Sequence, residues 1–421
     1  MPTSSFRSTP GICVSLWTAL LVGFSFWTIQ CRSESPEPAV QEWTERHAES
    51  IARSVLLADT HIDVPMLQLR EWKDLSQRVE GRDFDLVRAR EGGLDLAFMS
   101  LYVPAALGES RKARIRADAM IDLVERMVTE WPEQCALVRS VQEVREGVGR
   151  GKVLLAMGME NGAPIGGDLA NLRHFYRRGV RYITLTHSKA NHICDSSGDP
   201  VRRWDGLSPF GRTLVGEMNR MGVMIDVSHL SDSAFYQVVR LSRAPVLASH
   251  SSCRHFTPGW ERNVSDEMIR ALAGNGGVLQ LNFGSEFLTA EAQRYPDSTR
   301  RHMREVARLR GWTPGGKEAE DYERQYRRDH PFPAARLADF LKHVDHVVDL
   351  VGIDHVGLGS DFEGVGDTLP VGLKDASQYP NLILELLKGG YAEEDIAKIC
   401  SGNLLRVWSA VETCADREVI R

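Results

Sequence analysis

The chain has 421 residues, of which 43% are hydrophobic and 26% charged, and its formal net charge is −6. This composition is ordinary for a globular protein with a large core and excludes a disordered polyampholyte. Without a basic excess, nothing indicates nucleic-acid binding. The seven cysteines are scattered and form no CxxC pair, which argues against a zinc finger or a thioredoxin-type centre.

The beginning of the chain differs from the rest. Residues 11–29 are uncharged and rich in Leu, Val, Phe and Trp, and a stretch rich in Ser, Glu and Pro follows at 33–38. This order predicts an export signal or a membrane anchor at 1–32, a linker at 33–40 and the folded domain at 41–421. The protein is therefore expected in the periplasm or outside the cell, with membrane attachment as the alternative to cleavage.

From residue 41 onward, short apolar runs alternate with charged segments of helical period. After a helix at 41–53, buried strands are expected at 55–63, 94–103, 153–160, 182–187, 223–229, 245–250, 277–283 and 356–362. Helices are expected at 111–131, 168–178, 207–221, 231–242 and 265–273. Eight strands that alternate with helices predict an α/β fold, a (β/α)8 TIM barrel. A doubly wound open sheet is the alternative, but no GxGxxG turn follows the first strand.

The connection between the seventh and eighth strands is unusually long. It is dense in Arg, Glu and Asp, and we expect it to be a long helical insertion that ends in an amphipathic helix at 334–351. Loops of this length on barrels are typically lids or binding elements, with a solvated surface excursion as the alternative. Two closing helices are expected over 379–411.

Side chains that bind metals recur at the predicted carboxyl ends of the strands. They are His61 and Asp63 on the first strand, Glu160 on the third, His187, His229 and His250 on the next three, and Asp361 on the eighth. Residues two apart in a strand point to the same side, so His61 and Asp63 are expected to face one point in the barrel mouth. A single such His or Asp is usually a hydrogen-bonded or capping group. Here six strands carry such a side chain at their carboxyl ends, where barrel active sites form, and this recurrence indicates a metal centre. The combination of imidazole and carboxylate favours zinc.

These segments resemble the membrane (renal-type) dipeptidases of the amidohydrolase superfamily. The matching segments are ADTHID at 58–63, GMENG at 158–162, LTHS at 185–188, IDVSH at 225–229, ASHSS at 248–252, RNV at 262–264, VGIDH at 351–355 and GSDF at 359–362. The resemblance runs from about residue 55 to residue 408. An HxD motif alone is shared by many hydrolases, whereas the full ordered set is specific.

The resemblance implies an amidohydrolase-like barrel with two zinc ions per chain. His61 and Asp63 would bind one zinc, His229 and His250 the other, and Glu160 would bridge both. The implied activity is hydrolysis of the peptide bond of dipeptides by a hydroxide that bridges the metals. The resemblance also suggests a homodimer.

Three further residues receive roles from the same resemblance. His187 would contact the substrate carbonyl and stabilise the oxyanion, and Asp361 would be the catalytic acid and base. Arg262 would pair with the substrate carboxylate, because a guanidinium fork matches a carboxylate with two hydrogen bonds. That pairing would select dipeptides, the small peptide substrate, over proteins.

Two other functions are compatible with the sequence. One is another binuclear amidohydrolase, acting on a lactone, an N-acyl amino acid or a β-lactam. The other is a non-catalytic exported binding protein that kept the fold, which the intact Glu160 and Asp361 argue against.

Overall fold

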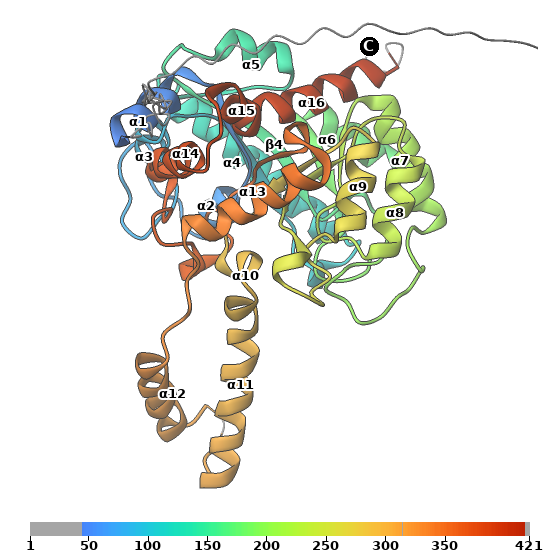
Figure 1. The fold of residues 1–421 in the computed structure, drawn as a ribbon. Coiled ribbons are helices and arrows are strands. Elements are labelled where there is room, and N and C mark those ends of the chain that lie inside the picture. The colour runs from blue at the N-terminus through green and yellow to red at the C-terminus, as the bar shows by residue number, and fades with distance from the viewer. Residues whose placement is uncertain (1–43, 314, 417–421) are drawn as a thin grey trace, which may run out of the picture. The chain divides into compact units, whose positions relative to one another are not determined.

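Eight parallel strands form a nearly closed α/β barrel with helices around it (Figure 1). The computed structural model describes residues 44–313 and 315–416, so the predicted export signal or anchor and the linker lie outside the described residues. The barrel strands follow one another in the order β1 (Leu57–Ile62), β2 (Leu94–Tyr102), β4 (Val153–Glu160), β5 (Val180–Thr184), β6 (Met224–Asp226), β7 (Leu247–Ser251), β8 (Val278–Leu281) and β9 (Val356–Leu358). A ninth strand, β3 (Cys135–Leu137), pairs with β4 outside this path.

Isolated contacts bring the two ends of this sheet together. Ile62 and Phe362 form a parallel bridge just beyond β1 and β9. The N–H of Asp63 donates to the carbonyl of Phe362 at 2.9 Å, and the N–H of Asp361 donates to the carbonyl of His61 at 3.0 Å. The contact that completes the barrel therefore involves residues of the predicted metal centre.

Alternate residues of the strands face the barrel interior and the surrounding helices. In β4, Leu154 and Ala156 belong to an apolar cluster that includes Trp408 of the last helix, whereas Leu155 and Met157 belong to the larger cluster beneath the helices. Glu160 continues the register of Leu154 and Ala156, so its side chain emerges on the interior side at the mouth.

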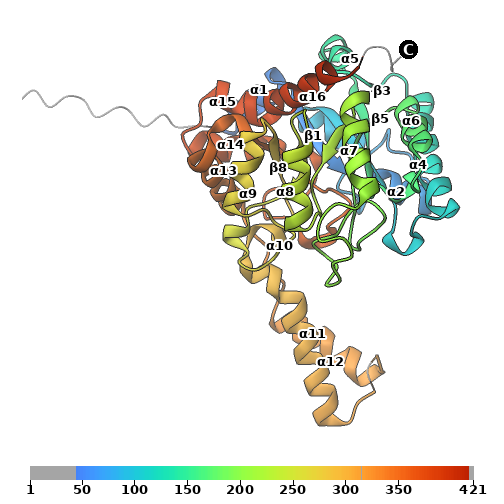
Figure 2. The same cartoon turned by 90° about the vertical axis from the view of Figure 1, so that its right-hand side faces the viewer.

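Helices surround the strands, and most of them lie between one strand and the next in the chain (Figures 1 and 2). They are α1 (Glu45–Ser54), α2 (Val64–Arg70), α3 (Leu86–Glu91), α4 (Arg111–Glu130), α5 (Val141–Gly147), α6 (Leu169–Arg177), α7 (Pro209–Met221), α8 (Asp232–Leu241), α9 (Asp266–Gly274), α10 (Ser285–Leu288), α13 (Leu337–Val351), α14 (Tyr379–Lys388), α15 (Glu393–Ala397) and α16 (Asn403–Cys414). Side-chain caps fix where several helices begin. The hydroxyls of Ser208, Ser231 and Ser265 accept hydrogen bonds from backbone N–H groups in the first turns of α7, α8 and α9. No helix in the described part of the chain is both long and apolar enough to cross a bilayer.

The segment between β8 and β9 contains α10 to α13. Two of its helices, α11 (Ala290–Arg310) and α12 (Lys317–Asp329), extend away from the barrel in both views (Figures 1 and 2). The amphipathic helix predicted at 334–351 is α13, and it packs against α9 and α14.

All eight predicted barrel strands are present, and the differences concern shorter elements. Four elements were not predicted, because their runs are too short to show a clear period: β3, α2, α3 and α5. The two closing helices expected over 379–411 are present: α14 is the first, and the second is the continuous stretch in which a π-helical turn at Lys398–Gly402 connects α15 to α16.

Candidate metal centre

The predicted site residues converge at the carboxyl ends of the strands. His61, Glu160 and His250 lie within β1, β4 and β7, near or at their ends. His187, His229 and Asp361 lie beyond the strands, in the turns that follow β5, β6 and β9. Asp63 follows β1 directly and precedes α2.

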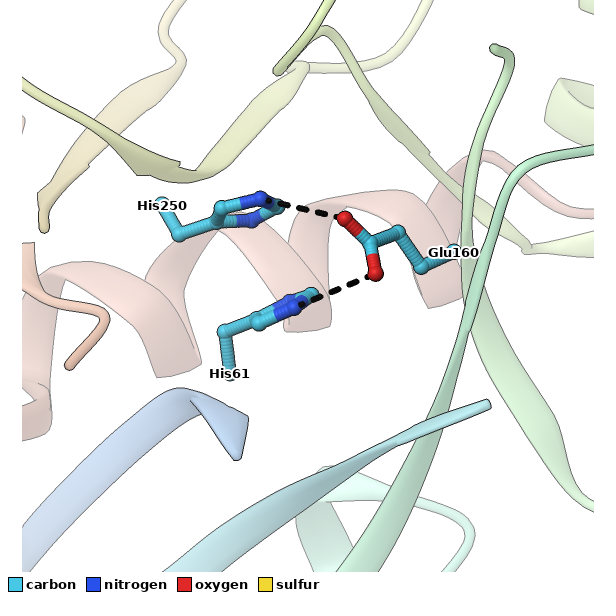
Figure 3. A group of neighbouring side chains, drawn as sticks. All are labelled: His61, Glu160 and His250. Carbon is cyan, nitrogen blue, oxygen red and sulfur yellow. Dashed lines mark ion pairs between the residues drawn. The ribbon is translucent and has the colours of Figure 1, made fainter. Parts of the chain in front are cut away.

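Glu160 occupies the middle of the cluster. Its Oε1 lies 3.1 Å from Nε2 of His229, 3.4 Å from Nε2 of His250 and 3.5 Å from Nε2 of His187. Its Oε2 lies 3.7 Å from Nε2 of His61. Figure 3 shows His61 and His250 directed at different oxygens of this carboxylate. One carboxylate thus reaches imidazoles from four strand ends.

Three overlapping groups in this cluster have a geometry that could hold a metal ion. They are His61 with Glu160 and His250, Glu160 with His187 and His229, and His61 with Asp63 and Asp361. Within each group the ligand atoms lie within 4.8 Å of one another. Because Glu160 belongs to two of the groups, the arrangement is that of a binuclear metal site.

Buried atoms without partners show that these residues fit a cation. Nε2 of His61 and Oδ1 of Asp63 are buried and have no hydrogen-bond partner among the described residues. Unpaired buried polar atoms are costly, and a metal ion would satisfy them. The carboxylates also favour positive charge: burial lowers the pKa of His61, but Glu160 and Asp63 raise it to about 10. The field that holds a proton on His61 would attract a divalent cation.

A tyrosine fixes which nitrogen His61 presents to the centre. The hydroxyl of Tyr182 donates to the carbonyl of Thr60 at 3.0 Å and lies 2.9 Å from Nδ1 of His61. Its one proton is used on Thr60, so it accepts from Nδ1–H. When the ring of His61 is neutral, as a metal ligand must be, its lone pair is therefore on Nε2, which faces Glu160. Gly158 makes room for this tyrosine, because a Cβ there would lie 1.9 Å from the ring of Tyr182.

A serine and an aspartate orient His250 in the same way. The hydroxyl of Ser249 donates to Oδ2 of Asp226 at 2.6 Å and lies 2.7 Å from Nδ1 of His250. It therefore accepts from Nδ1–H and leaves Nε2 of His250 free for the centre. Carboxylate-to-histidine chains of this kind orient metal ligands in many proteins.

Two site residues adopt a backbone conformation that side chains disfavour. His229 has φ of 68° and Asp361 has φ of 62°. Such left-handed conformations cost free energy and are concentrated at functional sites. Gly364 relieves crowding nearby, since a Cβ there would lie 2.1 Å from Oδ1 of Asp361 and 2.4 Å from Oδ2 of Asp63.

Asp361 has a hydrogen-bond partner that its sequence neighbours do not reveal. The amide of Asn282, just after β8, donates to Oδ2 of Asp361 at 2.7 Å. Burial raises the pKa of Asp361 to about 6, with Glu160 adding to the effect and His61 opposing it. The polar character of Asn282 at a strand end was the only signal in the sequence.

Arg262 is a half-buried cation next to the cluster. Its guanidinium donates to the Ser251 hydroxyl at 2.6 Å and to the carbonyl of His250 at 2.8 Å, and lies 3.1 Å from Nε2 of His229. Burial lowers its pKa to about 10. No carboxylate of the described residues lies within ion-pair distance of it, and Asp361 and Glu160 act on its charge only from farther away.

A cavity of about 490 Å³ opens onto the cluster. Its lining comprises Asp63, Met66, Arg70, Tyr102, Glu160, His187, His229, His250, Arg262, Glu286, Phe287, Asp361, Gly364, Val365 and Thr368. All eight predicted site residues except His61 therefore line it, and His61 lies behind, stacked on His250 with ring centroids 3.7 Å apart.

The barrel and its cluster define a metallohydrolase of the α/β-barrel class, and comparison with known proteins identifies the family. Residues 45–420 match the family described as membrane dipeptidase, peptidase family M19. The chain belongs to this family and is a peptide hydrolase, which confirms the resemblance found in the sequence.

Relatives and solved structures agree with this assignment. Dipeptidase aclJ of Aspergillus oryzae is 32% identical over 406 residues, which are 93% of this chain and 86% of that protein. The probable dipeptidase PvdM from Pseudomonas aeruginosa is 29% identical with a TM-score of 0.77, covering 88% of this chain and 99% of that one. A metallo peptidase from Rhodobacter sphaeroides, liganded with a phosphinate mimic of the dipeptide L-Ala-D-Ala, is 27% identical with a TM-score of 0.69, covering 85% and 99%. An amidohydrolase from Pseudomonas aeruginosa, 20% identical with a TM-score of 0.65, shares the fold.

Proposed function

We propose that the protein is a zinc-dependent dipeptidase that uses two zinc ions bridged by Glu160. The observation that carries this proposal is the position of Glu160, whose two oxygens face different imidazoles: Oε1 lies 3.1 Å from His229 and Oε2 lies 3.7 Å from His61. His61 and Asp63 would hold one ion, and His229 and His250 the other. Imidazole nitrogens and carboxylate oxygens are donors that suit zinc.

When bound, the ions supply Lewis acidity and lower the pKa of water toward neutrality. The protein's own groups position the substrate and move the protons. Asp361 takes the proton from the attacking water and returns it to the leaving amine, for which a raised pKa of about 6 is suited. His187 lines the cavity beside Glu160 and donates a hydrogen bond to the developing oxyanion.

In this proposal, Arg262 selects substrates that have a free C-terminal carboxylate. A half-buried guanidinium with no carboxylate within ion-pair distance is stabilised by an anionic ligand, and its fork geometry favours a carboxylate. A cavity of about 490 Å³ is in the range of small-molecule sites. We therefore propose short peptides with a free C-terminus as substrates, including dipeptides with a D-residue at that end, as the ligand of the Rhodobacter sphaeroides structure suggests.

The remaining predictions concern the surroundings of this site. We propose that α10 to α13 are an insertion that shapes the cavity mouth, since Glu286 and Phe287 of α10 line it. Export through residues 1–32, with or without membrane attachment, and assembly as a homodimer remain proposals from the sequence.

The proposal is tested with protein purified without chelator. Its metal content is measured, and L,L and L,D dipeptides are assayed before metal removal, after it and after zinc is restored. N-acyl amino acids, a lactone and a β-lactam are assayed in parallel. We expect dipeptide hydrolysis that disappears with the metal and returns with zinc. Turnover that survives complete metal removal, or that is confined to the other substrate classes, would contradict the proposal.

A further inference from the structure

A second group of metal-binding side chains lies outside the catalytic cavity. It consists of His255 in the short helix η3 (Arg254–Phe256), Asp266 at the start of α9 and His346 on α13. Each offers one ligand atom, and the three atoms lie within 4.8 Å of one another. None of the three residues lines the cavity that contains Glu160. Segments distant in sequence thus present two imidazoles and one carboxylate at one place.

The three side chains are held in position by their neighbours. Nε2 of His346 lies 2.8 Å from Oδ1 of Asp266. The rings of His255 and His346 are 4.4 Å apart between centroids and tilted by 31°. Phe256 packs edge-on against both rings, at 4.9 Å from His255 and 5.6 Å from His346. His255 is exposed, and neither of its ring nitrogens hydrogen-bonds to a described residue.

We propose that His255, Asp266 and His346 form a third metal site, which binds zinc or a similar first-row divalent ion. Two imidazoles and a carboxylate are a recurrent donor set for such ions. The separation of 2.8 Å between Nε2 of His346 and Oδ1 of Asp266 is that of a hydrogen bond, and the two atoms would move apart to about 3.4 Å around a tetrahedral ion at about 2.1 Å from each. Because His255 is exposed and the other two are half-buried, the remaining coordination positions are open to water and the ion is exchangeable.

Another His–Asp pair in the chain shows what distinguishes this site. Nε2 of His174 lies 2.7 Å from Oδ1 of Asp118, which is nearly the same spacing. Its third neighbour is the guanidinium of Arg178, with Nη1 3.5 Å from the same oxygen, where the proposed site has the imidazole of His255. A fixed positive charge repels a cation, whereas a neutral imidazole binds it. The His174 pair is therefore a matched control.

The proposed ion would brace the loop that carries Arg262. The base of this loop is closed by hydrogen bonds from the N–H of Arg254 to the carbonyl of Val264 at 2.8 Å and from the N–H of Val264 to the carbonyl of Ser252 at 2.9 Å. His255 lies on the outgoing arm, and Asp266 follows the returning arm. An ion shared by both, and by His346 on α13, would tie the two arms together and to the barrel. Zinc binding should therefore raise thermal stability.

The experiment compares zinc content and melting temperature in four full-length proteins: the wild type, His255→Ala, His346→Gln and the control His174→Ala. Each is equilibrated with buffered zinc, and bound zinc is counted by atomic emission. We expect the wild type and His174→Ala to bind one zinc per chain more than the other two variants. Added zinc should raise the melting temperature of the wild type by more than that of His255→Ala. Equal zinc content in all four proteins would overturn the proposal.

The readout is a difference between variants, so it does not depend on how many ions the Glu160 centre holds. If the wild type held no zinc at Glu160, the proposed dipeptidase mechanism would fail, yet the difference at His255 would still be measurable. Conversely, two ions at Glu160 in every variant with no further zinc would leave the proposed function intact and remove the third site.

Discussion

The hydroxyl oxygen of Tyr182 lies 2.9 Å from Nδ1 of His61, although 121 positions separate the two residues in the chain. The tyrosine itself cannot reach a metal ion held by Nε2 on the other side of the ring. Its contribution is to keep the Nδ1–H tautomer, so that the lone pair of His61 always faces Glu160. The sequence marks His61 through its HxD motif, whereas Tyr182 is visible only in the folded chain.

Replacing Tyr182 by phenylalanine tests this orientation. The variant Tyr182→Phe keeps the ring that packs on Phe98 but removes the acceptor for Nδ1–H. Loss of such an orienting partner typically weakens metal affinity or activity by about 10- to 100-fold. Competition with a fluorescent chelator measures the zinc affinity. Tyr391→Phe, which removes a hydroxyl bonded to Asp345 on the surface, is the control and should leave the affinity unchanged.

The variant Asp361→Asn separates a proton carrier from a metal ligand. Asp361 lies close enough to His61 and Asp63 to share an ion with them, so its position alone allows both roles. If Asp361 is the catalytic acid and base, the asparagine variant should retain both metals, and its kcat should be lower by about 100-fold or more. Metal analysis and steady-state kinetics on the same sample distinguish the roles. Loss of zinc together with activity would identify Asp361 as a ligand.

Arg262 should be needed only for substrates with a free carboxylate. The variant Arg262→Gln loses a charge-assisted interaction of about 1.5–3 kcal/mol, which corresponds to about a 10- to 100-fold lower kcat/KM for a dipeptide. The matching dipeptide amide lacks the carboxylate and should be hydrolysed equally by the variant and the wild type. The kinetic comparison uses both substrates at one pH. An equal loss on the amide would show that Arg262 does not recognise the C-terminus.

Stability should fall in mild acid because of His343. This buried residue accepts from the N–H of Cys253 through Nδ1 and donates to the carbonyl of Leu288 through Nε2, both at 3.0 Å, so only the neutral ring fits. Burial lowers its pKa to about 4. An unfolded chain takes up this proton below about pH 6.5, whereas the folded chain resists it until about pH 4.

Above pH 6.5, His343 should therefore not lower the free energy of unfolding. As the pH falls from 6.5 to 4, the free energy of unfolding should decline by up to about 3 kcal/mol. Urea unfolding across this window, compared between the wild type and His343→Gln, measures the effect. Parallel pH profiles for the two proteins would rule out His343 as the source.

The metal-binding side chains could be predicted from the sequence because parallel strands bring their carboxyl ends to one place. The prediction that β1 alternates strictly between two faces was incomplete, however. Ala58 faces the interior and Leu57 and Ile62 face the helices, which strict alternation does not permit. A register irregularity between Asp59 and Ile62 turns the strand, and only with it does His61 point into the mouth.

Contacts between side chains of elements distant in the chain could not be predicted from the sequence. Asn282 resembles any polar residue after a strand until the fold places it 2.7 Å from Asp361. His255, Asp266 and His346 have no common motif spacing, because their meeting depends on how α9 and α13 pack. Patterns along the chain predict which residues follow strands, but not which side chains support them.

Zinc-edge anomalous diffraction from crystals of the protein purified without chelator tests the central claim most directly. At the Glu160 carboxylate we expect two strong peaks on opposite sides, one within bonding distance of His61 and Asp63 and the other of His229 and His250. A peak at His255, Asp266 and His346 would belong to the proposed third site and does not count in this test. Metal content measured on dissolved crystals of the His255→Ala variant, which lacks the proposed third site, provides the independent count. A single peak, or peaks that leave Glu160 without a metal contact, would contradict the binuclear centre.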